Sequence, residues 1–150
     1  MQELKASLYN LCLQFIEGRI LTAETALKQA REASNDDTKS SAGDKYETSR
    51  EMMQQDIDRN KRLLIDAEEN QRVLNSIKDT PFSESARNGS LVTTDQGSFY
   101  LSISAGQLHF NDKVYFAISA VSPIGKLLLG KLTGDTFDFN GKKYTIKEVA

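Results

Sequence analysis

The sequence is poor in residues that build covalent or metal-held frameworks. It contains one cysteine, one histidine and no tryptophan among its 150 residues. A single cysteine cannot form an intramolecular disulfide, and one cysteine with one histidine is too few for a structural zinc site of the Cys/His type. We therefore expect Cys12 to be a small buried hydrophobic residue.

Long apolar runs and a strong charge of one sign are also missing. No stretch approaches the roughly 20 apolar residues of a membrane-spanning helix, and Glu3, Lys5 and Asn10 interrupt the segment where a secretory signal would be apolar. We expect a cytoplasmic protein with no membrane partner. The formal net charge of -2 lacks the basic excess that phosphate contacts require, so no direct binding to duplex DNA is expected.

Two long amphipathic segments fill the first half of the chain. The first places apolar residues three or four positions apart, at Leu4, Leu8, Leu11, Phe15, Ile20, Ala23, Leu27 and Ala30. The second repeats the pattern with Met53, Ile57, Leu64, Ala67, Leu74 and Ile77, and has Asn60 and Gln71 at heptad-like positions. Such stripes bury each other, so residues 1–80 are predicted to form an antiparallel coiled-coil hairpin.

A polar break between the two stripes is the predicted tip of the hairpin. It covers approximately residues 34–46, between the two helical patterns. The acidic residues of the tip are Asp36, Asp37 and Asp44, and Glu47 follows directly after it. By composition alone, such acids are usually solvated or cap a helix, and Asp44 with Glu47 has the spacing of a capping box.

The second half of the chain changes from helical to extended periodicity. Thr80–Pro81 disfavours helical backbone and Asn88–Gly89 is a turn dipeptide, so a second domain is predicted over residues 81–150. Its candidate strands are Leu91–Thr94, Phe99–Ser104, Gln107–Phe110, Val114–Ser119, Thr136–Phe139 and Lys143–Val149. Asn140–Gly141 is a hairpin signal, and Pro123–Leu129 followed by a glycine predicts a short helix. These features indicate an α+β protein whose second domain is a small antiparallel sheet with one helix.

Aromatic residues gather in this second domain. We expect them to form the core and flanks of the sheet rather than a ligand pocket. They are Phe99, Tyr100, Phe110, Tyr115, Phe116, Phe137 and Phe139.

One run of residues is similar to a known motif. It begins with Ser122, Pro123, Ile124 and Gly125 and continues to Leu129-Gly130-Lys131. Together with the order of the elements and the spacing from Tyr46 to Arg50-Glu51, it resembles the Gre-type transcript-cleavage factors of bacterial RNA polymerase. The resemblance covers nearly the whole chain.

The resemblance implies an FKBP-like sheet domain that docks on the rim of the polymerase secondary channel through Ser122, Pro123, Ile124 and Gly125. It further implies that the coiled coil enters the channel and that two tip carboxylates help to hold a Mg²⁺ ion at the active centre of the polymerase. The protein would have no catalytic residues and no cofactor of its own. Its partner would be bacterial RNA polymerase, and it would meet the RNA 3′ end only inside that complex.

The tip departs from the family pattern. The family reads approximately Gly-Asp-Leu-Lys-Glu-Asn before the tyrosine, whereas this chain is two residues longer there. If Asp37 and Lys39 are aligned with the family, the second acidic position falls on Ser40. Asp36 or Asp44 could replace that carboxylate, so Asp36, Asp37 and Asp44 are the expected tip carboxylates and Asp37 with Asp36 the expected Mg²⁺ ligands.

The leading hypothesis is therefore an RNA polymerase-binding elongation factor that stimulates cleavage of backtracked RNA, acting through the polymerase rather than as an enzyme. An alternative keeps the docking but makes the altered tip a non-cleaving regulator or inhibitor. Two further alternatives are a prolyl isomerase or chaperone, suggested only by the implied fold, and an unrelated coiled-coil adaptor.

Overall fold

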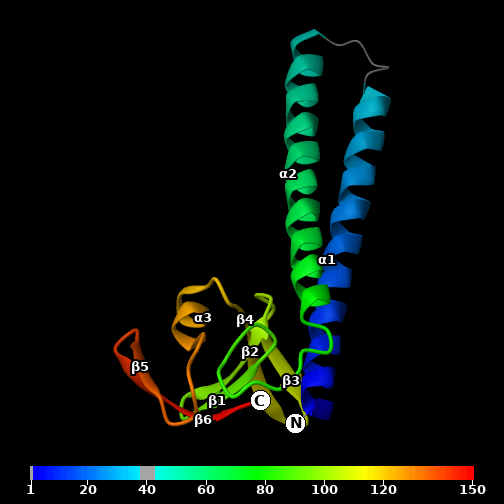
Figure 1. Cartoon of the computed structure of the whole chain (residues 1–150). Helices are drawn as coiled ribbons and strands as arrows, with labels where there is room; N and C mark the ends of the chain where they lie inside the picture. The colour runs from blue at the N-terminus through cyan, green and yellow to red at the C-terminus, as the bar shows by residue number, and fades with distance from the viewer. Residues whose placement is uncertain (1, 38–42) are drawn as a thin grey trace. The chain divides into compact units, whose positions relative to one another are not determined.

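The computed structural model describes residues 2–37 and 43–150, without the side chains of residues 35–37 and 43–47. Two long helices come first, α1 (Gln2–Asp37) and α2 (Gly43–Ser76), and a sheet with one short helix follows (Figure 1). The chain divides into two compact units. One contains Ile16–Asn70, and the other combines Met1–Phe15 with Gln71–Ala150. The α+β class predicted from the sequence is confirmed.

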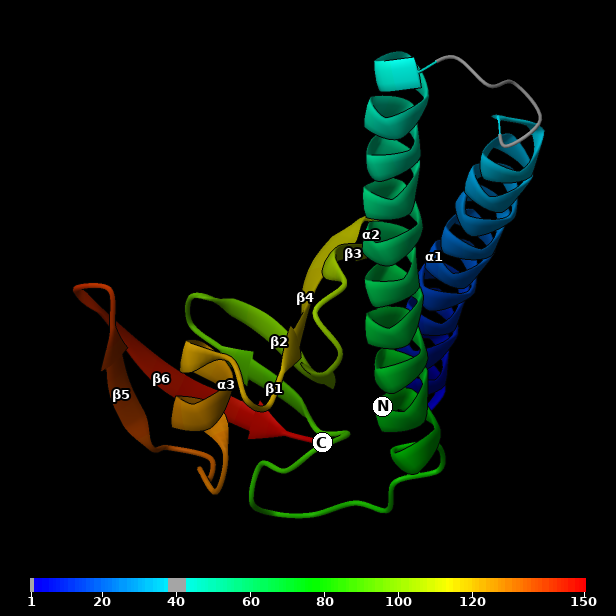
Figure 2. The same cartoon turned by 90° about the horizontal axis from the view of Figure 1, so that it is seen from above.

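The two long helices are antiparallel and run side by side, as a hairpin requires (Figure 2). Every residue of the two predicted stripes is buried or half-buried, which confirms the helical periodicity. In the unit of residues 16–70, the seam contains Ile16, Ala23 and Leu27 from α1 and Ile57 and Ala67 from α2. No helix among the described residues is long and apolar enough to cross a membrane.

Helical backbone extends into both ends of the segment assigned to the tip. The α1 helix continues to Asp37, and α2 begins at Gly43. The sequence contains no glycine or proline between Gly18 and Asp37, which is consistent with an unbroken α1 over that stretch. The division of the chain into domains at residue 80 stays a prediction.

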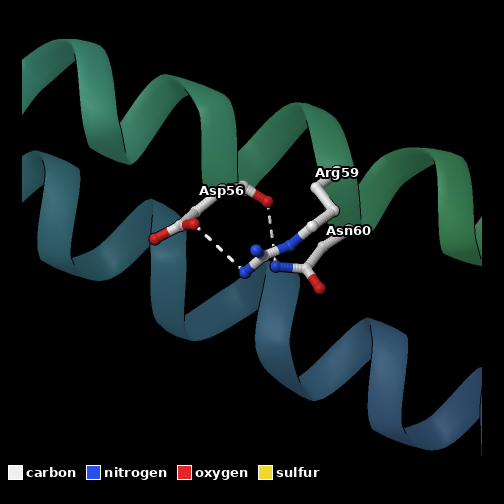
Figure 3. A network of polar contacts seen from close by, with 3 residues as sticks. All are labelled: Asp56, Arg59 and Asn60. Carbon is white, nitrogen blue, oxygen red and sulfur yellow. Dashed lines mark hydrogen bonds and ion pairs between the residues drawn. The ribbon is translucent and has the colours of Figure 1, made fainter.

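Asn60 is a polar residue in the otherwise apolar seam of α2. Its side chain is 8% exposed, and its amide nitrogen donates to the Asp56 carbonyl of the same helix at 2.9 Å (Figure 3). Beside it, Arg59 Nη2 lies 3.1 Å from Asp56 Oδ1, in an exposed ion pair of small energetic value. A polar residue at such a position favours one helix register at a cost in stability.

The six strands form a mixed sheet with the order β3-β4-β2-β1-β6-β5. Their bounds are β1 Leu91–Thr94, β2 Gly97–Ser102, β3 Gly106–Phe110, β4 Lys113–Ser119, β5 Thr136–Phe139 and β6 Lys142–Val149. Each lies within two residues of its predicted segment. The Asn140–Gly141 hairpin is confirmed, with φ of 51° and 77° at the two turn residues.

The prediction of an all-antiparallel sheet is wrong in one place. Strand β4 runs parallel to β2, with Ser98 opposite Tyr115 and Ser102 opposite Ser119. The reason is that β3 lies outside β4 and carries the chain back, so that β4 enters the sheet beside β2 in the same direction. The direction of pairing depends on which distant strand lies alongside, and the local apolar pattern of β4 does not record this.

Strand β2 is buried on both faces. Phe99 and Leu101 belong to a core with Leu128 of the short helix α3 (Pro123–Leu128). The alternate residues Tyr100 and Ser102 are also buried, at 2% and 1% exposure. Because successive side chains of a strand point to opposite faces, these two pairs serve different layers.

Replacing Asn60 with leucine is expected to raise the free energy of unfolding by about 1 kcal/mol, because a buried amide is exchanged for apolar contact in the helix seam. Urea unfolding followed by circular dichroism measures the change. The matched control is Gln55→Leu at an exposed position of α2, which should leave stability nearly unchanged. A clear loss of stability in Asn60→Leu would contradict this account.

Candidate functional site

The Ser122–Gly125 motif forms the start of α3. The Ser122 hydroxyl donates to the Ser119 carbonyl at 2.6 Å and accepts the Gly125 N–H at 3.1 Å. Ser122 is thus the N-cap of the helix, and Pro123 occupies a first-turn position where its missing N–H has no cost. The hydroxyl ties the end of β4 to the helix that follows.

Gly125 is fixed by close packing. A Cβ atom built on it would lie 2.0 Å from the Ser119 carbonyl oxygen, far inside any tolerated contact. The residue is buried, and its own carbonyl accepts the Leu129 N–H at 3.1 Å. Any side chain here would push α3 away from the end of β4.

The structure brings the four motif residues together, but it gives them different exposures. Ile124 is half-buried and packs against the sheet core, and Gly125 is buried. Ser122 is half-buried, and Pro123 alone among the four is exposed. Three of the four therefore have a structural role in this turn, whatever else they do.

Exposed apolar residues flank α3, and the sequence reasoning missed them. Val121 precedes the helix with 75% of its surface exposed, and Leu129 and Leu132 follow it with 40% and 47% exposed. All three lie outside the helices and strands of the structure. The predicted helix Pro123–Leu129 includes Leu129, but its exposure could not be read from the sequence. We call Val121, Pro123, Leu129 and Leu132 the α3 flank.

The predicted tip carboxylates Asp36, Asp37 and Asp44 lie outside the described side chains. Their assignment, including Asp37 with Asp36 as Mg²⁺ ligands, stays a prediction. Among the side chains that are described, no group of three or more histidine, cysteine or acidic residues is placed to hold a metal ion.

The seven aromatic residues expected in the core and flanks of the sheet are buried or half-buried, whereas Phe82, which precedes the sheet, is exposed. Phe137 stacks on Tyr144 with ring centroids 4.9 Å apart, and Phe99 packs against Phe116 at 5.7 Å. Tyr100 differs from the others because it is buried and also lines a cavity.

Cys12 is a buried residue, as predicted. Its Sγ lies 3.6 Å from the Ser102 hydroxyl. Burial raises the pKa of the Cys12 thiol, and the hydrogen bond to Ser102 opposes this change only in part. The neutral thiol is therefore the form at physiological pH, which fits a packing role rather than a reactive one.

Comparison with models of known protein families gave no match, and comparison with curated proteins gave none either. The likeness to Gre-type factors therefore depends on the residues and the order of elements described above.

Replacing Ser122 with alanine should lower the free energy of unfolding by about 1 kcal/mol, because the Gly125 N–H loses its cap. The measurement is chemical unfolding of the full chain. Ser122→Thr retains the hydroxyl and should lose much less. Equal losses in the two variants would show that the hydroxyl does not stabilise this turn.

Proposed function

We propose that this protein is a transcription elongation factor that binds bacterial RNA polymerase, inserts the α1–α2 hairpin into the secondary channel and stimulates cleavage of backtracked RNA. The observation that carries the proposal is the order of parts. Two long paired helices precede a mixed sheet, and that sheet bears the Ser122–Gly125 turn at the start of α3. The resemblance implies the same order.

An FKBP-like identity of the sheet domain is part of this proposal. The packing of Leu128 from α3 against the core of the sheet supports it. The parallel β2–β4 pair departs from the expected antiparallel sheet. The aromatic side chains Phe99, Phe137 and Tyr144 pack against one another or against the core, which favours a docking domain over a prolyl isomerase. The partner implies a cytoplasmic location.

The chemistry would take place on the polymerase. A water oxygen attacks the phosphorus of an RNA phosphodiester, and the bond from phosphorus to the 3′ oxygen breaks. The upstream RNA keeps a 3′ hydroxyl, and the released fragment carries a 5′ phosphate. Asp36, Asp37 and Asp44 would supply one or two carboxylates to a shared Mg²⁺, and the polymerase, RNA and water would provide the remaining ligands.

A non-cleaving regulator is the second candidate, because the tip is two residues longer than the family pattern and has Ser40 at an acidic position. In that case the hairpin would occupy the channel without placing a working carboxylate pair. Both candidates use the same docking, so they differ only in what the tip does.

Changing Asp36, Asp37 and Asp44 together to asparagine should lower RNA cleavage by about 100-fold, because the shared Mg²⁺ loses its carboxylates. The measurement is shortening of labelled RNA in a backtracked elongation complex of the cognate polymerase at millimolar Mg²⁺.

The matched control for this triple variant removes three exposed acids elsewhere on the hairpin, as Glu24→Gln, Glu32→Gln and Asp66→Asn. It loses the same charge and should keep full cleavage. Slowed extension without shortened transcripts, in both the native protein and the triple variant, would favour the non-cleaving regulator. No effect of the native protein on either reaction would contradict the proposal as a whole.

Val121→Asp should weaken binding to RNA polymerase by roughly tenfold, because a charge replaces an apolar contact at the α3 flank. Its side chain is 75% exposed, so the stability of the free protein should hardly change. Affinity is measured by titration of labelled protein with core polymerase.

Val114→Asp is the control, since Val114 is also an exposed valine, with 42% of its surface accessible, and lies on β4 outside the α3 flank. It should leave the affinity close to that of the native protein. If both valine variants bind as tightly as the native chain, the α3 flank is not the docking surface.

A further inference from the structure

A cavity of about 650 Å³ lies within the unit formed by residues 1–15 and 71–150. Three parts of the chain line it. Lys5 and Tyr9 come from the first turns of α1, Lys78 and Asp79 follow the end of α2, and Tyr100 comes from β2. Small-molecule sites commonly have volumes of about 300–1,000 Å³, so the cavity is large enough for a compact organic ligand.

The wall that follows α2 is held in place by short contacts. A Cβ atom added to Gly89 would lie 2.5 Å from the Thr80 hydroxyl, so the two segments touch directly. The Thr80 N–H donates to the Ile77 carbonyl at 3.2 Å, and Arg87 Nη2 donates to the Pro81 carbonyl at 2.6 Å. The cavity wall is therefore formed before any ligand arrives, which lowers the cost of binding.

The ammonium group of Lys5 is disfavoured both by burial and by a nearby charge of the same sign. This side chain is half-buried, and burial lowers the pKa of its ammonium group. The charged neighbour that adds to this effect is Arg87, which lowers the pKa further because it has the same sign. An anion placed here would offset both the repulsion and the loss of solvation.

The tyrosines provide hydrogen-bond donors on an apolar surface. Burial raises the pKa of both Tyr9 and Tyr100, so their hydroxyls stay protonated at physiological pH. Asp79 adds to the effect on Tyr9 and is the one carboxylate among the lining residues. Lys78 lines the same cavity, and Ala6 and Leu13 contribute apolar wall.

We propose that this cavity binds a small organic anion whose carboxylate or phosphate group lies near Lys5 and whose flat apolar body lies against Tyr9 and Tyr100. The cavity, its formed wall and the two lysines among its lining residues, Lys5 and Lys78, carry this inference. It is independent of polymerase binding.

The experiment is calorimetric titration of the full chain with four probes. Adenosine monophosphate carries a phosphate on a flat body, and salicylate carries a carboxylate on one. Inorganic phosphate lacks the body, and adenosine lacks the oxyanion. We expect one of the two organic anions to bind at one site with a Kd below about 1 mM, and phosphate and adenosine to bind at least about tenfold more weakly.

Two variants locate the binding. Lys5→Gln should weaken it by about tenfold, through loss of a charge-assisted hydrogen bond. Ala6→Phe should abolish it by filling the cavity from an exposed position without removing a charge. Lys28→Gln removes an exposed lysine of α1 in the other unit and should change nothing.

Several results would overturn the proposal. The proposal fails if neither organic anion saturates the protein. It also fails if adenosine binds as tightly as adenosine monophosphate, or if inorganic phosphate does. Unchanged binding in both Lys5→Gln and Ala6→Phe, with circular dichroism like that of the native protein, would also show that the anion binds elsewhere.

Discussion

The two-sided burial of β2 is the constraint on which the sheet-containing unit depends. Phe99 and Leu101 pack toward the core that includes α3, whereas Tyr100 and Ser102 are buried on the other face. Cys12 of α1 lies 3.6 Å from the Ser102 hydroxyl, so the second face is covered by the start of α1. A single strand thus joins two layers. A polar residue in place of Phe99 or Leu101 would bury a polar group in the apolar core.

The residues at the start of α3 have a structural role that is independent of any partner. The double use of the Ser122 hydroxyl and the close approach of Gly125 to Ser119 explain those residues without any partner. A partner could contact the exposed residues beside them, such as Val121 and Pro123. If the proposed docking occurs here, the turn would favour it by holding those neighbours in one position.

The two sites proposed for this chain, the tip and the cavity, differ in the charge of their residues. The tip concentrates carboxylates in the sequence, which suits a hard cation. The lining of the cavity includes Lys5 and Lys78 with two tyrosines and one carboxylate, that of Asp79, and we propose that it takes an anion. The sequence predicted only the tip, because its acids are neighbours along the chain, and that assignment stays a prediction. The cavity residues come from three segments, and none of these segments has an unusual composition.

The sequence by itself determined the two helices, the six strands, the short helix α3 and the hairpin at Asn140–Gly141. Periodicity and turn chemistry are local, and they specify which side chains are buried. Tertiary structure alone decided the parallel pairing of β2 with β4 and the placement of Tyr100 at a cavity. The turn at Asn111–Asp112, with φ of 50° and 60°, also emerged only there, since this dipeptide is a weaker hairpin signal than one with glycine. The physical reason is that burial can be read from a pattern, whereas the identity of the burying partner depends on contacts between distant segments.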